Sequence, residues 1–163
     1  MDIIDGDILT FPLGSGAILH SCDISGEMKN NNTTKQISYR FPALHTDHEK
    51  IIEEGRDSLL GGFFCHKTEL GLIVSLYCEK ATMSRKLDYE YFLKSYSSAL
   101  AYLETLSSPP KIAIPYKIGC GEAGGHWPIV LEILKYSFES YSNIGNIIRN
   151  PLEWLRNSEA NND

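Results

Sequence analysis

Four glycines lie close together in one short segment of this chain, at Gly119, Gly121, Gly124 and Gly125. They follow an apolar run of buried-strand character at residues 112–114 and precede helical apolar spacing that begins at Trp127. Glycine backbone can approach a ligand closely, and the start of a helix presents free N–H groups and a partial positive charge. This order of strand, glycine loop and helix predicts a phosphate or anion site. The alternative is a tight turn with no ligand.

Four histidines and one cysteine could also do chemistry. His45 and His48 have metal-ligand spacing, but nothing completes a ligand set, so we expect exposed histidines and no metal ion or cofactor. His20 ends an apolar run, where it orients a water or phosphate or is a hydrogen-bonded core residue. His126 precedes the helix that follows the glycine loop, where it is a candidate ligand contact. Cys120 lies at that helix start, which predicts a lowered pKa, although no base partner is evident.

The overall composition limits the classes of protein. The chain has 163 residues, enough for one domain, which we expect at residues 1–156 with a disordered tail at 157–163. Its net charge of −6 predicts no general affinity for nucleic acid. No apolar run is long enough to cross a bilayer, so we expect no membrane partner. The four cysteines form no close pair, and no signal peptide is evident, so we expect a cytoplasmic protein.

Strand-like and helix-like segments alternate along the chain. Strands are predicted at residues 3–4, 17–22, 63–67, 70–78, 112–114 and 146–149, with a hairpin between the third and fourth. Helices are predicted at residues 34–41, 47–60, 88–106 and 127–141, with a helical turn at 151–156. The apolar face of the 127–141 helix is predicted to be Ile129, Ile133, Leu134, Phe138 and Tyr141. The pattern predicts an α/β fold with a mixed sheet between helical layers, whose ligand lies beyond the carboxyl ends of the strands.

Three loops at that edge resemble those of the macrodomains, which bind ADP-ribose. The strongest match is residues 114–121 with 124–127, which are similar to the family's I-P-x-I-G-C-G-x-x-G-x-x-W loop and helix start. Residues 6–8 resemble its opening G-D-I, and residues 25–28 and 35–42 resemble its first ligand loop and helix. The resemblance covers about residues 3–150 and implies a three-layer α/β/α macrodomain.

The resemblance also implies ligand contacts. The adenine amino group would be bound by Asp7, with the Ile8 backbone beside it. Tyr141, Phe138 and Ile148 remain open as candidates to stack on adenine. To these we add His20 from its position at a strand end. The remaining predicted contacts are Ser25, Gly26, Met28, Pro115, Ile118, Gly119, Cys120, Gly121, Glu122, Ala123 and Gly124.

One branch of the family is most similar: the terminal ADP-ribose glycohydrolases of proteins and the antitoxins that remove ADP-ribose from DNA. Its catalytic lysine corresponds to Lys80, which would attack the anomeric carbon of the ADP-ribosyl group and form a covalent lysyl intermediate that water releases. An amine is nucleophilic only when deprotonated, and Arg85 and Lys86 could lower its pKa. The alternative is a solvated lysine, or one that pairs with the diphosphate.

Two departures from the family keep three functions open. Residues 29–34 replace the family's first glycine-rich loop, and Ala123 stands where the protein-directed enzyme has an acidic residue. The first function is hydrolysis that frees ADP-ribose from a modified protein or nucleic acid. The second is a module that binds ADP-ribose, a related nucleotide or an ADP-ribosylated macromolecule without turnover. The third is a phosphatase for ADP-ribose 1″-phosphate that uses His20 or Asp23.

Overall fold

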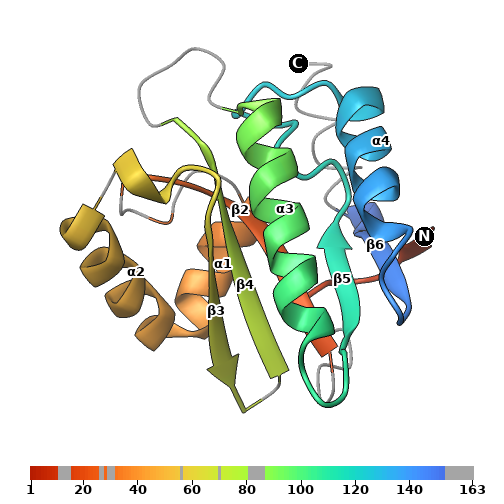
Figure 1. Ribbon diagram of the computed structural model, residues 1–163, viewed down its shortest axis with the longest axis horizontal. Coiled ribbons are helices and arrows are strands. Elements are labelled where there is room, and N and C mark those ends of the chain that lie inside the picture. The colour runs from red at the N-terminus through yellow and green to blue at the C-terminus, as the bar shows by residue number, and fades with distance from the viewer. Residues whose placement is uncertain are drawn as a thin grey trace.

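A computed structural model describes residues 1–10, 16–25, 28, 32–55, 57–69, 71–80 and 87–152. Six strands form one sheet in the order β1-β6-β5-β2-β4-β3 (Figure 1). Their bounds are Asp2–Asp5 (β1), Gly16–Asp23 (β2), Phe63–Thr68 (β3), Gly71–Glu79 (β4), Lys111–Pro115 (β5) and Gly145–Arg149 (β6). All neighbours pair in parallel except β3 and β4, which form the predicted antiparallel hairpin.

Helices cover both faces of the sheet (Figure 1). They are α1 (Asn32–Arg40), α2 (Pro42–Gly55), α3 (Tyr89–Glu104) and α4 (Trp127–Phe138), and a 3-10 turn, η2, spans Asp57–Leu59. One core cluster joins α3 and α4 to the sheet through Leu19, and another joins α1 and α2 to it through Ile18. Because successive side chains of a strand point to opposite faces, these neighbours on β2 bury both faces at once. The three-layer prediction is confirmed.

Helices α1 and α3 lie within two residues of their predicted bounds, whereas α2 and α4 differ by more. Helix α2 begins at Pro42 instead of Asp47 and ends at Gly55, because proline suits the first position of a helix as well as the end of the preceding one. Helix α4 ends at Phe138. Its Ile129 is 43% exposed, whereas Val130 is fully buried and takes the core position instead.

The chain ends bear on two further predictions. Of the helical turn predicted at 151–156, residues 151–152 are helical. The rest of that turn and the predicted tail at 157–163 lie outside the described residues. Among the helices of the described chain, none is long and apolar enough to span a bilayer.

The parallel strands bring five loops to one edge of the sheet. Strands β1, β6, β5, β2 and β4 all run in the same direction, so their carboxyl ends meet there. The segments after Asp5, Asp23, Glu79, Pro115 and Arg149 therefore begin at this edge. These include the glycine loop and Lys80, so the topology gathers the predicted ligand residues as expected.

Candidate functional site

The glycine loop leaves β5 after Pro115 and ends where α4 begins. Four backbone hydrogen bonds fold it. Two run from Ile118 N–H to the Pro115 carbonyl (3.1 Å) and from Gly124 N–H to the Gly121 carbonyl (3.0 Å). The others run from Cys120 N–H to the Lys117 carbonyl (2.9 Å) and from Gly125 N–H to the Gly119 carbonyl (2.9 Å). The loop reaches the left-handed region at Lys117 (φ 58°), Gly119 (φ 71°) and Gly124 (φ 76°). Such angles favour glycine at two of these positions, and the Lys117 backbone adopts the same conformation with a side chain.

The fold requires glycine at some positions of this loop and not at others. A Cβ at Gly125 would lie 2.6 Å from the Gly119 carbonyl oxygen and 2.5 Å from Leu87 Cδ2. At Gly121, by contrast, no described atom lies within 4 Å of an added Cβ, and φ is not in the left-handed region. The folding of the loop therefore explains Gly125 but leaves Gly121 facing open space.

Three consecutive N–H groups of the loop are available as donors. Within the described ranges, the N–H groups of Gly121, Glu122 and Ala123 donate no hydrogen bond, whereas those of Cys120 and Gly124 do. The Ala123 side chain is 5% exposed, and Glu122 is exposed. Adjacent unengaged N–H groups form the kind of cradle that binds an anion. This arrangement agrees with the predicted anion site.

Lys80 follows β4 at the same edge. Its side chain is 40% exposed, and Nζ lies 3.4 Å from Asp88 Oδ2 and 5.7 Å from the centroid of the Tyr91 ring. Although partial burial alone would raise the pKa of Asp88, the Tyr91 N–H hydrogen bond and the Lys80 cation together hold that pKa below its usual value. Arg85 and Lys86, predicted to activate the lysine, lie outside the described residues. Sequence reasoning identified Asp88 as a helix cap but missed its contact with Lys80.

Asp7 lies beyond β1 and is exposed. One of its carboxylate oxygens, Oδ1, accepts the Leu9 N–H at 2.9 Å, which fixes the side chain within a local turn. The neighbouring Ile8 is 8% exposed and packs in the core beside α1 and α2. This placement leaves Asp7 accessible at the ligand edge.

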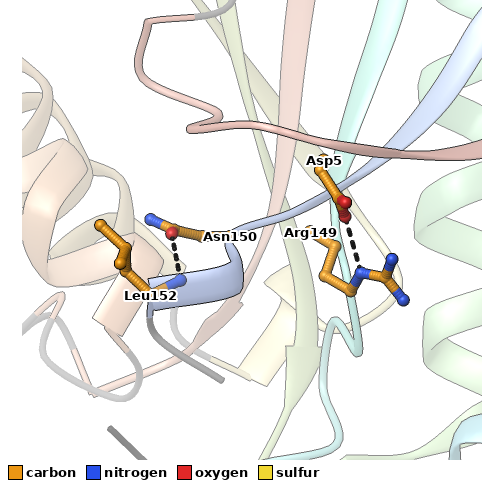
Figure 2. A network of polar contacts seen from close by, with 4 residues as sticks. All are labelled: Asp5, Arg149, Asn150 and Leu152. Carbon is orange, nitrogen blue, oxygen red and sulfur yellow. Dashed lines mark hydrogen bonds and ion pairs between the residues drawn. The ribbon is translucent and has the colours of Figure 1, made fainter. Parts of the chain in front are cut away.

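An ion pair joins the carboxyl ends of β1 and β6. Asp5 Oδ1 accepts a hydrogen bond from Arg149 Nε at 2.8 Å (Figure 2). The Arg149 guanidinium also lies 5.8 Å from the centroid of the Tyr116 ring. That ring packs edge-on against the Trp127 ring, with the two centroids 5.1 Å apart. Sequence reasoning did not predict these contacts of Tyr116, although an aromatic residue directly after β5 was a signal for them.

Two of the three candidates for adenine stacking lie at the wrong edge. The Tyr141 hydroxyl donates to the carbonyl of Pro110, which precedes β5. Phe138 packs on Tyr141 and against Gly145, the first residue of β6. Both aromatic residues are therefore at the amino ends of the strands. Ile148 lies near the carboxyl end of β6, at the predicted edge, but its side chain is 4% exposed and belongs to the core cluster beside α1 and α2.

His20 is fully buried between β4 and α1. Its Nδ1 lies 2.9 Å from Thr34 Oγ1, and its Nε2 lies 2.9 Å from Ser75 Oγ. Because the Thr34 hydroxyl donates to the Ser21 carbonyl, Nδ1 must carry the proton and Nε2 must accept from Ser75. Burial, together with repulsion from His48, lowers the pKa of His20 to about 3. This placement favours the alternative of a core histidine, and both ring nitrogens are engaged.

His48 is 1% exposed, so the prediction of an exposed residue is wrong. Its ring stacks on Tyr77 (centroids 5.3 Å apart), and Nδ1 lies 2.8 Å from the Tyr77 hydroxyl. Burial lowers the pKa of His48 to about 4, although nearby Asp23 opposes this. Its sequence neighbour His45 lies 3.4 Å from Glu49. The described residues contain no group of three potential metal-binding side chains.

The expected low pKa of Cys120 is also wrong. Partial burial raises the pKa of this thiol to about 11, more than Lys117 lowers it. The thiol instead donates a hydrogen bond to the Ile118 carbonyl, whose oxygen lies 3.4 Å from Sγ. Within the loop, Ile118 and Pro115 are buried, whereas Gly124 and the side chain of His126 are exposed.

The first ligand loop is described only in part. Asp23 Oδ1 accepts both the N–H and the hydroxyl of Ser25, at 3.0 and 2.6 Å. Met28 is 1% exposed, with φ at 50°. Gly26 lies outside the described residues, as do residues 29–31, the first half of the segment that departs from the family pattern.

Solved structures resemble this one over nearly the whole chain, although no protein-family model and no curated protein sequence matches it. The macrodomain of Mycobacterium tuberculosis DarG has a TM-score of 0.75 at 20% identity over 92% of this chain and 97% of its own. The macrodomain of Thermus aquaticus DarG has a TM-score of 0.75 at 19% identity, with the same coverage of 92% and 97%. Thermosipho africanus DarTG in complex with ADP-ribose has a TM-score of 0.72 at 17% identity over 91% of this chain and 40% of its own. The chain therefore has the macrodomain fold.

Proposed function

We propose that this chain binds ADP-ribose at the carboxyl edge of its sheet and hydrolyses the bond that joins ADP-ribose to a modified protein or nucleic acid. The open space at Gly121, beside unengaged N–H groups at residues 121–123, carries the proposal. A side chain there would obstruct nothing within the described protein, but it would obstruct a diphosphate on the loop. The similar Thermosipho africanus structure contains ADP-ribose, which supports this choice of ligand.

Calorimetric titration with ADP-ribose tests the binding proposal, with AMP and ADP as controls. We expect micromolar affinity and a preference for ADP-ribose, because the proposed pocket spans an adenine end near Asp7 and a ribose end near Lys80. Gly121→Ala is expected to weaken binding by about tenfold while the melting temperature stays constant. If ADP-ribose fails to bind, or if Gly121→Ala binds as tightly as the wild type, the glycine loop is not its site.

In the proposed hydrolysis, Lys80 is the nucleophile. The Nζ lone pair attacks the anomeric carbon, the bond to the macromolecule breaks, and water later displaces the lysine. Lys80→Ala and Lys80→Arg are expected to abolish release of ADP-ribose from mono-ADP-ribosylated DNA and protein. Lys80→Arg keeps a cation beside Asp88, so a charge-only role would leave it active. Turnover by either variant would contradict the lysyl mechanism.

Binding without turnover is the second candidate. It is favoured by Ala123, which is 5% exposed and provides no carboxylate in the loop. This candidate predicts the same ADP-ribose affinity with no release from either modified macromolecule. Release of ADP-ribose by the wild type, measured beside the Lys80 variants, therefore separates the two functions.

A further inference from the structure

A carboxylate and an aromatic ring at the start of α3 lie beside the Lys80 ammonium. Asp88 Oδ2 lies 3.4 Å from Nζ, and the centroid of the Tyr91 ring lies 5.7 Å from it. The other oxygen of the same carboxylate, Oδ1, accepts the Tyr91 N–H at 3.0 Å and caps the helix. Because one oxygen is fixed by the helix start, the oxygen that faces Lys80 has a defined position as well.

Backbone contacts join the same helix start to the end of β4. The Asp88 N–H donates to the Cys78 carbonyl at 3.1 Å, and Glu79 and Leu87 form an isolated antiparallel bridge. These contacts hold the backbone on either side of residues 81–86. Both the backbone and the ammonium of Lys80 are therefore positioned relative to α3.

The glycine loop is attached to this helix start too. The Leu87 N–H donates to the Ala123 carbonyl at 3.0 Å, and the Tyr89 hydroxyl accepts the His126 N–H at 2.9 Å. A ligand bound on the loop would thus be placed relative to the segment that contacts Lys80. The relative position of the lysine and the ligand depends on residues 87–89.

We propose that Asp88 is a positioning residue that holds Lys80 Nζ where ADP-ribose on the glycine loop presents its anomeric carbon. This rests on the proposed function of Lys80. A displacement of about 1 Å between reacting atoms can cost about 100-fold in rate. A carboxylate also stabilises the protonated, non-nucleophilic amine, so charge alone predicts that its removal accelerates the reaction. The two effects have opposite signs, which makes the sign of the change decisive.

Asp88→Asn is the test variant, since asparagine keeps the cap oxygen but loses the charge that binds Lys80. Asp47→Asn is the matched control, because Asp47 pairs with His66 at 3.0 Å on other elements of the fold. The probe is free ADP-ribose with cyanoborohydride. The ribose opens to an aldehyde, the Lys80 amine adds to C1″, and water leaves to form an imine. Hydride then reduces the carbon and a solvent proton neutralises the nitrogen, which leaves a stable secondary amine on the Lys80 peptide.

At saturating ADP-ribose, we expect Asp88→Asn to label Lys80 about tenfold more slowly than the wild type, with Asp47→Asn unchanged. Labelling of Asp88→Asn at the wild-type rate or faster would overturn the positioning role. The melting temperature is measured for each variant, and Asp88→Ser, which also keeps a cap oxygen, replaces any variant that fails to fold. If the wild type labels Lys80 no faster than the exposed Lys94 and Lys135, the lysine chemistry of the proposed function fails instead.

Discussion

Two buried histidines are expected to make this protein strongly sensitive to acid. His20 and His48 are neutral in the folded state, with pKa values lowered by burial to about 3 and about 4 from an ordinary 6.5. Below pH 6.5 the unfolded chain takes up protons at both positions while the folded chain does not. Stability is therefore fully present above pH 6.5 and is lost as the pH falls towards the folded pKa values.

The magnitude follows from these pKa values. Between pH 7 and pH 5, each histidine is expected to remove about 2 kcal/mol from the free energy of unfolding, so the pair removes about 4 kcal/mol. That is a large part of the roughly 5–15 kcal/mol typical of a domain. Urea unfolding at the two pH values, each extrapolated to water, measures the loss directly.

His20→Gln isolates one contribution. Glutamine offers a donor and an acceptor to Thr34 and Ser75 but does not titrate, so the acid-induced loss should shrink by about 2 kcal/mol. Any packing cost of the substitution is present at both pH values and cancels in the difference. His126→Gln is the control, because that side chain is exposed and makes no cap hydrogen bond. If His20→Gln loses as much stability between pH 7 and pH 5 as the wild type, the view that His20 stays neutral in the folded state is wrong.

Three further predictions concern the ligand edge. Gly125→Ala should lower the free energy of unfolding by about 1–3 kcal/mol, measured by urea, because its Cβ meets backbone at 2.6 Å, whereas Gly121→Ala should change it little. Alkylation of Cys120 by iodoacetamide at pH 7.5 should be about 100-fold slower than in the urea-unfolded chain, judged by peptide mass, since its pKa is raised to about 11; equal rates would refute this. Asp5→Asn should cost less than about 1 kcal/mol, because its pair with Arg149 is exposed, and a larger loss in urea unfolding would contradict that view.

Elements set by local patterns were predictable from the sequence. The apolar run at residues 17–19 indicated the buried strand β2, and α3 begins where Asp88 offers a cap. The glycine loop was identified by its composition, and its place at the carboxyl edge follows from parallel strands. Pro42 misled the prediction of α2 because the same residue can end one helix and begin the next.

Features that depend on distant partners were not predictable. The burial of His48 depends on Tyr77, which lies 29 residues away on a central strand. Likewise, helical spacing placed Tyr141 on the α4 face, but its hydroxyl binds the carbonyl of Pro110, 31 residues earlier, at the opposite edge of the sheet. A lysine in a polar run offers no sequence signal for the carboxylate that it will contact. In each case the partner is chosen by the topology of the sheet.

The start of α3 links the glycine loop to Lys80, which couples ligand affinity to the reactivity of the lysine. The Leu87 side chain packs against Gly119 and Gly125, where neither residue has a Cβ. The Leu87 N–H donates to the Ala123 carbonyl of the loop. The next residue, Asp88, contacts Lys80. A change that loosens this helix start would displace the lysine and the loop together, so ligand affinity and lysine reactivity would fall in parallel. Asp88→Asn keeps the cap and removes only the contact with Lys80, so it should lower reactivity while ADP-ribose affinity is retained.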